Sequence, residues 1–330
     1  MRIGLDAMGG DLAPKSPVRG AVEAVKAYGY HVTLVGKESV IRGELEEIPY
    51  PQDKIDIMDT EEAIGMDEPA ALSVRKKRQS SIVKGIEFLK NGVFDAFVSA
   101  GNTGAVVCAA TLSLRLLPGV DRPGIAIILP TLMKPCMVID VGANVDPKPL
   151  HLLQYGIMGD AYSKHILSKE SPTVALLNIG EESTKGTDFT REAHIMLRES
   201  QLNFIGNVEP KEVYGGKTDV VVCDGFVGNL FLKVTEAFAE TAGKLLRREL
   251  KSSSALTKLG ALMTLPAFKA LKKKIDADEY GGAPLMGVDG SVIIAHGSSD
   301  AKAIMNALRA AAENVSHKVN THVVEELQSF

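Results

Sequence analysis

One pattern recurs along the chain. A short run of Val, Ile, Leu and Ala stops at Gly, Asn, Asp or Ser, and a helical pattern often follows, most clearly in AFVSAGNTGAVVCAA at residues 96–110. Residues 3–14, 220–229 and 292–303 repeat it, and VIDVGANVDP and ALLNIGEESTKG end a strand in a longer loop. Parallel strands buried on both faces are apolar nearly throughout. In a parallel α/β sheet such junctions open on the carboxyl edge, where ligands bind, so we expect these loops to converge on one crevice.

Helical patterns separate many of these apolar runs. The alternation predicts an α/β fold of three αβα layers, a mostly parallel doubly wound sheet with helices on both faces. Lys134–Pro135 falls between two adjacent strands and predicts a tight turn, hence one antiparallel pair. We expect one catalytic domain over residues 1–330. Strands are expected at 2–6, 32–35, 55–58, 96–99, 124–129, 136–140, 173–177, 220–222 and 291–295, and helices at 17–28, 80–91, 105–116, 150–167, 190–200, 230–250 and 300–328.

Composition narrows the function classes. A net charge of −4, no Trp and 5% aromatic residues argue against nucleic-acid binding. Cys108, Cys136 and Cys223 lie in apolar runs without CxxC spacing, which predicts reduced thiols in the cytoplasm and no cysteine-bound metal. The chain begins directly with a strand, so we expect no signal peptide. No apolar stretch reaches the roughly 18 residues of a membrane-spanning helix.

Residues 244–274 differ from the rest. Lys and Arg far outnumber acids there, with Glu249 the only acidic residue. We predict a helical excursion over residues 230–275, two helices that meet at an apolar tip. One interpretation is a dimer or core helix pair with solvated lysines. The other is a tip that enters an anionic bilayer surface, and the two are compatible. The membrane contacts would be Leu256, Leu259, Leu262, Met263 and Leu265.

Two glycine-rich loops suit an anion. Gly9, Gly10 and Asp11 follow the first strand and precede a helix, so amides and a helix N-terminus can meet a ligand. After Ser99, the loop GNTG adds Asn102 and Thr103 as donors. Ordinary turn chemistry explains one such loop, but several on one edge favour an anionic ligand. Neither GxGxxG nor GxxxxGK[ST] occurs, so no dinucleotide fingerprint or P-loop is present.

A basic run, RKKR at residues 75–78, precedes Ser80 and Ser81. Such runs are usually solvated faces. Arg75, Lys77 and two serines that cap the next helix would also form a phosphate clamp. The position beside a helix start favours the clamp.

Further polar residues end strands or follow them. Carboxylates there orient cations, bind a metal or act as bases. A lone His after a strand is as compatible with structure as with catalysis. Cys223 is expected to point into the sheet packing, and no GxSxG elbow or HExxH motif is present. The candidates are Asp6, Asp140, Asp224, Asn144, Asn178, Asn229, Lys185 and His296.

Taken together, these segments resemble a known family. LDAMGGD, VRKKRQSSI, SAGNTGA, DVGANVD, LLNIGEESTKG, CDGFVGN and AHGSSDAKA occur in the order found in the bacterial phosphate:acyl-[acyl-carrier-protein] acyltransferases of phospholipid synthesis. The resemblance runs from Arg2 to about Asn314, which is nearly the whole chain. One of these motifs alone would be weak evidence for the family, but the seven motifs in this order are specific evidence.

The resemblance implies a fold similar to phosphotransacetylases and isopropylmalate dehydrogenases, with a protruding helix pair. It implies transfer of a fatty acyl group from acyl carrier protein to inorganic phosphate, without a cofactor or metal, and a downstream membrane acyltransferase that uses the acyl phosphate. It also implies a homodimer on the membrane surface. We assign oxyanion stabilisation to Lys185 and Asn229 and group Asp224 with them as catalytic. The remaining candidates would bind substrate or phosphate.

Two rivals remain open at this point. An oxidative decarboxylase on the same fold would need NAD and a divalent metal on an Asp cluster that includes Asp140 and Asp224. A non-enzymatic membrane scaffold for carrier protein would explain the Leu/Lys segment and leave the glycine loops unused.

Overall fold

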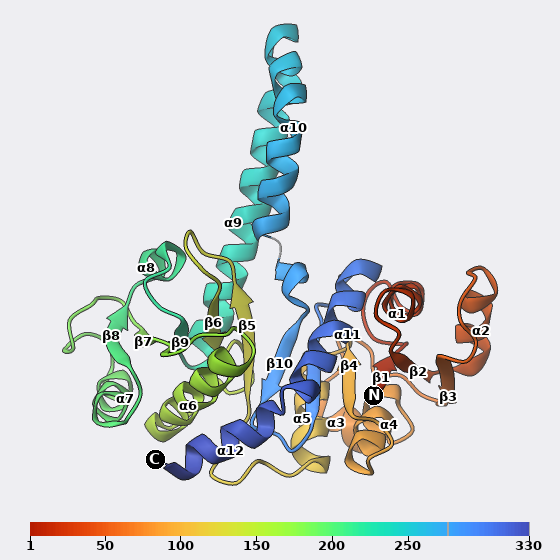
Figure 1. The fold of residues 1–330 in the computed structure, drawn as a ribbon, viewed down its shortest axis with the longest axis horizontal. Helices are drawn as coiled ribbons and strands as arrows, with labels where there is room; N and C mark the ends of the chain where they lie inside the picture. The colour runs from red at the N-terminus through yellow and green to blue at the C-terminus, as the bar shows by residue number, and fades with distance from the viewer. Residues whose placement is uncertain (276, 330) are drawn as a thin grey trace.

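The computed structural model describes residues 1–275 and 277–329, without the side chains of residues 269 and 271–278. One eleven-stranded sheet runs through the described part in the order β3-β2-β1-β4-β11-β10-β5-β6-β9-β7-β8 (Figure 1). The strands are β1 Arg2–Asp6, β2 His31–Gly36, β3 Ile55–Asp59, β4 Ala96–Ser99, β5 Gly124–Leu129, β6 Cys136–Ile139, β7 Val174–Leu177, β8 Phe204–Val208, β9 Val220–Val222, β10 Ala283–Met286 and β11 Ser291–Ile294.

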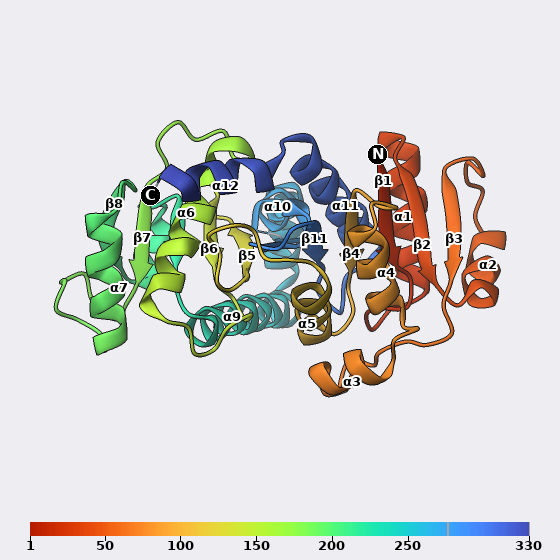
Figure 2. The same cartoon turned by 90° about the horizontal axis from the view of Figure 1, so that it is seen from below.

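The helices lie on both faces of this sheet, as the alternating pattern predicts (Figure 2). They are α1 Lys15–Tyr28, α2 Glu38–Glu46, α3 Ala70–Lys76, α4 Ser81–Lys90, α5 Thr103–Ser113, α6 Pro149–His165, α7 Asp188–Glu199, α8 Pro210–Gly215, α9 Gly225–Ser252, α10 Ala255–Ile275, α11 Ala301–Ser316 and α12 Val319–Ser329, with a 3₁₀ turn η1 at Ala277–Tyr280.

Strand direction divides the sheet into two parallel sets. Strands β3, β2, β1, β4 and β11 are mutually parallel, and so are β6, β9, β7 and β8. Between the sets, β11 with β10, β10 with β5 and β5 with β6 are all antiparallel, so the sets run in opposite directions. The expected antiparallel turn at Lys134–Pro135 is confirmed. The expectation that all the junctions open on one edge is wrong, because the strand ends of the two sets lie on opposite edges of the ladder.

Side chains from both parallel sets of strands pack into one apolar cluster on the same face of the sheet. Phe97 of β4 and Val221 of β9 point into the same apolar cluster, which α3, α4, α5, α8 and α9 cover. Their strand neighbours point to the other face, into a cluster under α1 and α11 or one under α6, α7 and α12. Burying a side chain of this size contributes roughly 1.5–3 kcal/mol. Helices α5 and α9, which start at strand ends of different sets, therefore lie on the same side of the sheet (Figure 2).

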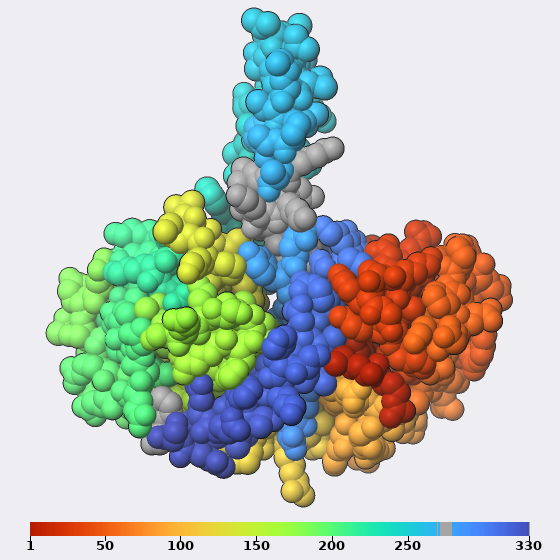
Figure 3. Space-filling model, viewed as in Figure 1, coloured from red at the N-terminus to blue at the C-terminus, as the bar shows by residue number. Residues whose placement is uncertain are grey.

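Helices α9 and α10 form a hairpin that stands clear of the body (Figures 1 and 3). Its turn, Ser253 and Ser254, is polar rather than apolar, and α10 continues through Pro266. Large apolar side chains along both helices are exposed, among them Phe238 at 74% and Met263 at 78%. The predicted membrane contacts Leu256, Leu259, Leu262, Met263 and Leu265 all belong to this exposed set. Lys272–Lys274, which belong to the basic segment over residues 244–274, lie outside the described side chains.

Some expected elements differ from the structure. Strands β8 and β10 and helices α2, α3 and α8 were not expected. The expected helix over residues 300–328 is two helices, since Lys318 between α11 and α12 has φ of 49°. A positive φ in a non-glycine residue ends a helix and re-aims the chain. No helix in the described residues is both long and apolar enough to cross a membrane.

Candidate active site

A group of buried polar residues ties together the carboxyl ends of neighbouring strands; we call it the Asp6 cluster and define it as Asp6, Gly9, Ser81, Ser99 and Gly101. Asp6 ends β1 and is fully buried, and it accepts a hydrogen bond from the Ser99 hydroxyl at the end of β4 (2.7 Å). Ser99 in turn accepts one from the Gly101 amide (3.0 Å). A Cβ on Gly9 would lie 2.6 Å from the Gly101 nitrogen, so only glycine permits this approach of the two loops.

The loop after β11 joins the same group. The Asp11 amide donates to the Gly297 carbonyl (2.7 Å), and a Cβ on Gly10 would lie 2.9 Å from that oxygen. His296, beside Gly297, is exposed, and its Nδ1 lies 2.7 Å from the Ser298 hydroxyl. The predicted ligand residues Asp11 and His296 therefore lie at the rim of one loop assembly.

Asn102 serves the local structure. Its side-chain oxygen caps α5 by accepting from the Ala105 amide (3.0 Å). Its side-chain nitrogen donates to the carbonyls of Gly65, Met66 and Glu68. With Asn102 fully used, the exposed donors at the start of α5 are those of Thr103 and Gly104, because the first amides of a helix have no intrahelical acceptor.

The basic run is divided between two roles. Lys77 donates to the Glu68 carboxylate (2.5 Å) and to the Ala63 carbonyl (2.8 Å), so its charge is already partnered. The Lys77 hydrogen bond is the main reason that the pKa of Glu68 is lowered to about 2. Arg75 is exposed, and its guanidinium forms no hydrogen bond or ion pair with the described residues.

The serine pair differs from expectation. Ser80 is the N-cap residue of α4 but makes no side-chain cap, so the predicted capping role is wrong for its hydroxyl. That hydroxyl is buried and has no hydrogen-bond partner in the described structure. Ser81 contacts Asp6 instead. The sequence did not predict Glu68 as the ion-pair partner of Lys77, because no periodic pattern or motif links these two residues.

A second group surrounds Asp140 after β6; we call it the Asp140 cluster and define it as Asp140, Asn144, Gly225 and Gly228. The Asp140 carboxylate accepts from the amides of Gly142, Ala143 and Asn144 in its own loop and from Ile125 of β5. The Asn144 side chain donates to the Pro123 carbonyl and the Tyr155 hydroxyl. Both residues, predicted as substrate contacts, have their polar groups engaged in holding this loop.

Glycines bring α9 onto that loop. A Cβ on Gly228 would lie 2.0 Å from the Asp140 carbonyl oxygen, and one on Gly225 would lie 2.7 Å from the Asn144 carbonyl oxygen. Asp224 caps α9 by accepting from the amides of Phe226 and Val227. Cys223 is buried against the apolar core, as expected for a residue in sheet packing, and burial raises its pKa well above the usual value.

Two predicted catalytic groups remain exposed. Asn229 directly follows Gly228 on α9. It lies beside Gly142, since a Cβ built on Gly142 would be 3.7 Å from Asn229 Cγ. Lys185 lies in the loop after β7, held where its carbonyl accepts from the Asn178 side chain (3.2 Å). The Lys185 ammonium has no partner among the described residues. No hydrogen bond links either residue, or the Asp140 cluster, to the Asp6 cluster.

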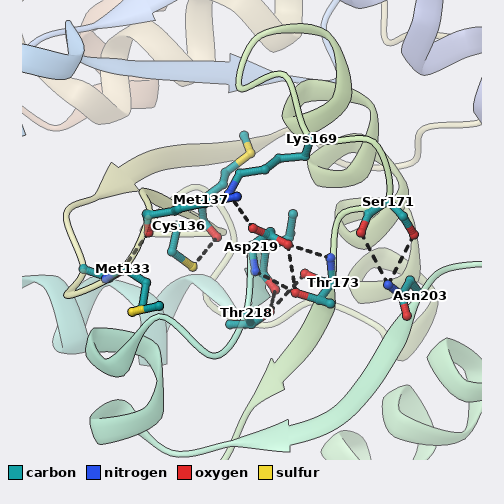
Figure 4. A network of polar contacts seen from close by, with 12 residues as sticks. Met133, Cys136, Met137, Lys169, Ser171, Thr173, Asn203, Thr218 and Asp219 are labelled. Carbon is teal, nitrogen blue, oxygen red and sulfur yellow. Dashed lines mark hydrogen bonds and ion pairs between the residues drawn. The ribbon is translucent and has the colours of Figure 1, made fainter.

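The opposite end of β7 and β9 carries a network with a different character (Figure 4). Lys169 pairs with Asp219 (2.6 Å), and Thr173 donates to the same carboxylate from both its amide and its hydroxyl (3.0 Å each). Burial alone would raise the pKa of Asp219, but these hydrogen bonds outweigh burial and lower it. The network joins the starts of two strands, and none of the predicted site residues belongs to it.

Among the described residues no group of three or more His, Cys, Asp or Glu side chains is placed to hold a metal ion. Asp140 and Asp224, which a metal-dependent decarboxylase would need, accept hydrogen bonds from backbone amides. The donors that remain exposed are amides, hydroxyls, an arginine and a lysine, which suit an anion.

Solved structures share this fold. A phosphotransacetylase from Streptococcus pyogenes aligns with a TM-score of 0.67 over 96% of this chain and 94% of its own, at 18% identity. The EutD phosphotransacetylase from Staphylococcus aureus aligns with a TM-score of 0.61 over the same shares, at 14% identity. At these identities the likeness is one of fold: the chain shares the mostly parallel α/β fold of these two proteins.

Sequence comparison is more specific. A family model described as a fatty acid synthesis protein matches residues 1–322. The chain is 49% identical to the phosphate acyltransferase of Dictyoglomus turgidum, over 100% of this chain and 98% of that protein. It is 46% identical to the phosphate acyltransferase of Geobacter sulfurreducens, over 100% and 95%. The chain therefore belongs to the bacterial phosphate acyltransferase family and is an acyltransferase, which confirms the resemblance read from its motifs.

Proposed function

We propose that the protein transfers a fatty acyl group from acyl-acyl carrier protein to inorganic phosphate, and that its acyl phosphate product enters phosphatidic acid synthesis through a membrane acyltransferase. The observation that carries the proposal is the joining of the β1, β4 and β11 loops around the start of α5. Thr103 and Gly104 are exposed there, and their amides belong to the positive end of an eleven-residue helix. Such an end favours a phosphate.

Phosphate is the nucleophile in this proposal. A substantial share of it is dianionic near neutral pH, so it needs positioning more than deprotonation. The α5 amides hold it, and Arg75 supplies a guanidinium with free donors, which suits a phosphate oxygen. Lys77 does not contact the phosphate. It forms an ion pair with Glu68, and the Glu68 carbonyl accepts a hydrogen bond from the Asn102 side chain.

A phosphate oxygen attacks the thioester carbonyl, the carbon–sulfur bond breaks, and the phosphopantetheine thiolate leaves. We assign stabilisation of the developing oxyanion to Lys185 and Asn229, which in this proposal approach the phosphate end across the sheet face that α5 and α9 share. Each well-aimed donor is worth roughly 3–4 kcal/mol. A leaving thiol with a pKa of about 8.5 departs with little acid assistance. Holding both substrates together supplies much of the remaining acceleration. No covalent enzyme intermediate forms.

The hairpin supports the remaining parts of the proposal. Exposed apolar residues on α9 and α10, such as Val234 and Phe238, suit a second copy of the chain and hence a homodimer. Leu256 and Met263 near the turn suit contact with the membrane surface that receives an insoluble product. Arg247, Arg248 and Lys251 give the end of α9 a basic stripe for acidic carrier protein or for lipid headgroups.

Purified protein, phosphate and palmitoyl-acyl carrier protein test the reaction. We expect phosphate-dependent release of carrier thiol and an equal amount of acyl phosphate, trapped as the hydroxamate. Thiol release without phosphate, or no acyl phosphate, would refute the proposal. Mass spectrometry of quenched enzyme tests direct attack, because acyl label on Cys223 or on a serine means a covalent intermediate.

Lys185→Ala and Asn229→Ala test the oxyanion assignment. Both side chains are exposed, so we expect turnover to fall by at least about tenfold with little change in thermal unfolding. Lys211→Ala, an exposed lysine on α8, is the matched control and should retain normal turnover. Normal rates in both test variants would remove these residues from the mechanism.

A further inference from the structure

Asp6 is the point at which three separate segments meet. Its carboxylate accepts from the Met8 amide (3.0 Å) in its own loop and from Ser99 at the end of β4 (2.7 Å). Ser81, the first residue of α4, is the third contact. Packing reinforces this meeting, because a Cβ on Gly85 of α4 would lie 2.0 Å from the Phe97 ring of β4.

The glycine loops enclose the same carboxylate. A Cβ on Gly9 would lie 2.5 Å from Asp6 Oδ2, and one on Gly101 would lie 3.1 Å from it. Asp6 is fully buried and therefore presents no oxygen to a ligand in solution. Its carboxylate fixes the backbone of both loops from beneath.

Burial of the Asp6 carboxyl group is energetically unfavourable for its charged form. Burial raises the pKa of Asp6, and hydrogen bonds from Ser81, Ser99 and the amides of Met8 and Gly9 oppose the rise. No basic side chain forms an ion pair with Asp6 in the described residues. An unpaired buried carboxyl is unfavourable unless hydrogen bonds compensate for it, so apolar residues would serve mere packing at least as well.

We infer that Asp6 is a positioning residue for the phosphate: it joins the β1 and β4 loops and the start of α4 into one rigid support and does not touch the anion itself. This inference rests on the proposed function, in which the α5 amides above these loops hold phosphate. It corrects the expectation that Asp6, Ser81 and Ser99 are direct phosphate ligands. Loss of the support should weaken phosphate binding selectively, because the acyl donor does not depend on these loops.

Asp6→Asn and Ser99→Ala test the inference. An Asn side chain keeps the shape but replaces one acceptor oxygen by a donor, so one of the hydrogen bonds that Asp6 accepts must break or reverse its direction. A small displacement of binding groups is enough for a large loss, so we expect the KM for phosphate to rise by about tenfold or more. The KM for acyl-carrier protein should stay within about twofold, and the double variant should be little worse than either single one.

Asp219→Asn is the control, because it alters a partly buried carboxylate that accepts hydrogen bonds from the hydroxyl and the amide of Thr173 but lies at the start of β9, in the other parallel set of strands (Figure 4). It should lower stability and leave the KM for phosphate unchanged. An unchanged KM for phosphate in Asp6→Asn, or equal rises in both KM values, would overturn the inference.

Calorimetric titration with inorganic phosphate alone separates this inference from the proposed function. Phosphate binding to the wild-type protein that weakens in Asp6→Asn supports the positioning role even if no acyl phosphate is formed. Acyl phosphate formation with unchanged phosphate affinity in Asp6→Asn would retain the proposed function and reject the positioning role.

Discussion

Asp6 and Asp140 end strands in the two oppositely directed halves of the sheet, and both are buried with a raised pKa. Asp140 is satisfied by amides, mostly of its own loop, and that loop then receives α9 through Gly225 and Gly228. Asp6 takes hydroxyl groups from distant segments. Similar carboxyl groups at strand ends therefore have different roles: Asp140 closes one loop, while Asp6 joins several segments.

The largest expected effect concerns the Asp140 cluster. Gly228→Ala puts a Cβ 2.0 Å from the Asp140 carbonyl oxygen and 2.8 Å from Cys223 Sγ. Backbone must move, so we expect a loss of about 3 kcal/mol or more in the free energy of unfolding. Gly243→Ala on the same helix has open space around it and should gain up to about 1 kcal/mol. Urea unfolding followed by circular dichroism measures both, and similar midpoints would contradict the tight α9 contact.

The second effect concerns the Asp6 cluster. Gly9→Ala puts a Cβ 2.5 Å from Asp6 Oδ2 and 2.6 Å from the Gly101 nitrogen, so the loops must separate. We expect a stability loss of about 1–3 kcal/mol together with a large rise in the KM for phosphate. Gly43→Ala, with nothing near its Cβ, is the control. A Gly9→Ala enzyme with normal phosphate kinetics would erase the functional difference between the two clusters.

Asp219 is a carboxylate outside both clusters, and its loss should affect stability alone. Asp219→Asn removes the charge paired with Lys169 and should cost about 2 kcal/mol at neutral pH. The folded-state pKa of Asp219 is lowered, so its contribution is present above the unfolded pKa and is lost as pH falls through the folded value. The gap between wild type and variant should therefore shrink below about pH 4. Thermal unfolding between pH 3 and pH 7 measures it; a constant gap argues against the ion pair.

The smallest effect concerns Glu326, where α12 meets α6. Burial, with Asp160 nearby, raises the pKa of Glu326 to about 7, although Lys164 donates to it (3.1 Å). A raised carboxyl pKa means that stability falls as pH rises from the unfolded value through about 7. Glu326→Gln should lose this dependence, so its stability relative to wild type improves between pH 5 and pH 8. Parallel melting curves at both pH values would refute the raised pKa.

Much of the fold could be predicted because its strands are continuous apolar runs. The missed strands lack that signal: β8 is an edge strand that contains Gly206 and Asn207, and β10 is short and contains Pro284. The break between α11 and α12 depends on the positive φ of Lys318, and a lysine in the sequence does not indicate that conformation. The Leu/Lys composition predicts the helical hairpin but not its polar serine turn.

The site was predicted less completely, for a physical reason. Motifs identify which residues lie at strand ends, and they identified Asp6, Ser99 and Asp140. They do not say whether a carboxylate faces ligand or backbone, because that depends on amides and hydroxyls brought in from other segments. Lys77 is the plainest example, since its partner Glu68 belongs to a loop with no motif.

The sequence by itself determined the layered α/β class, the family and the set of strand-end loops, because hydrophobic periodicity and ordered motifs are local properties of the chain. Only the tertiary structure decided the direction of the two halves, since the antiparallel pairings of β10 and β5 reverse the second set. It also separated the glycine junctions into a group that supports an open helix N-terminus and a group that anchors α9. Contacts between segments far apart in the chain make that distinction, and local sequence patterns do not encode them.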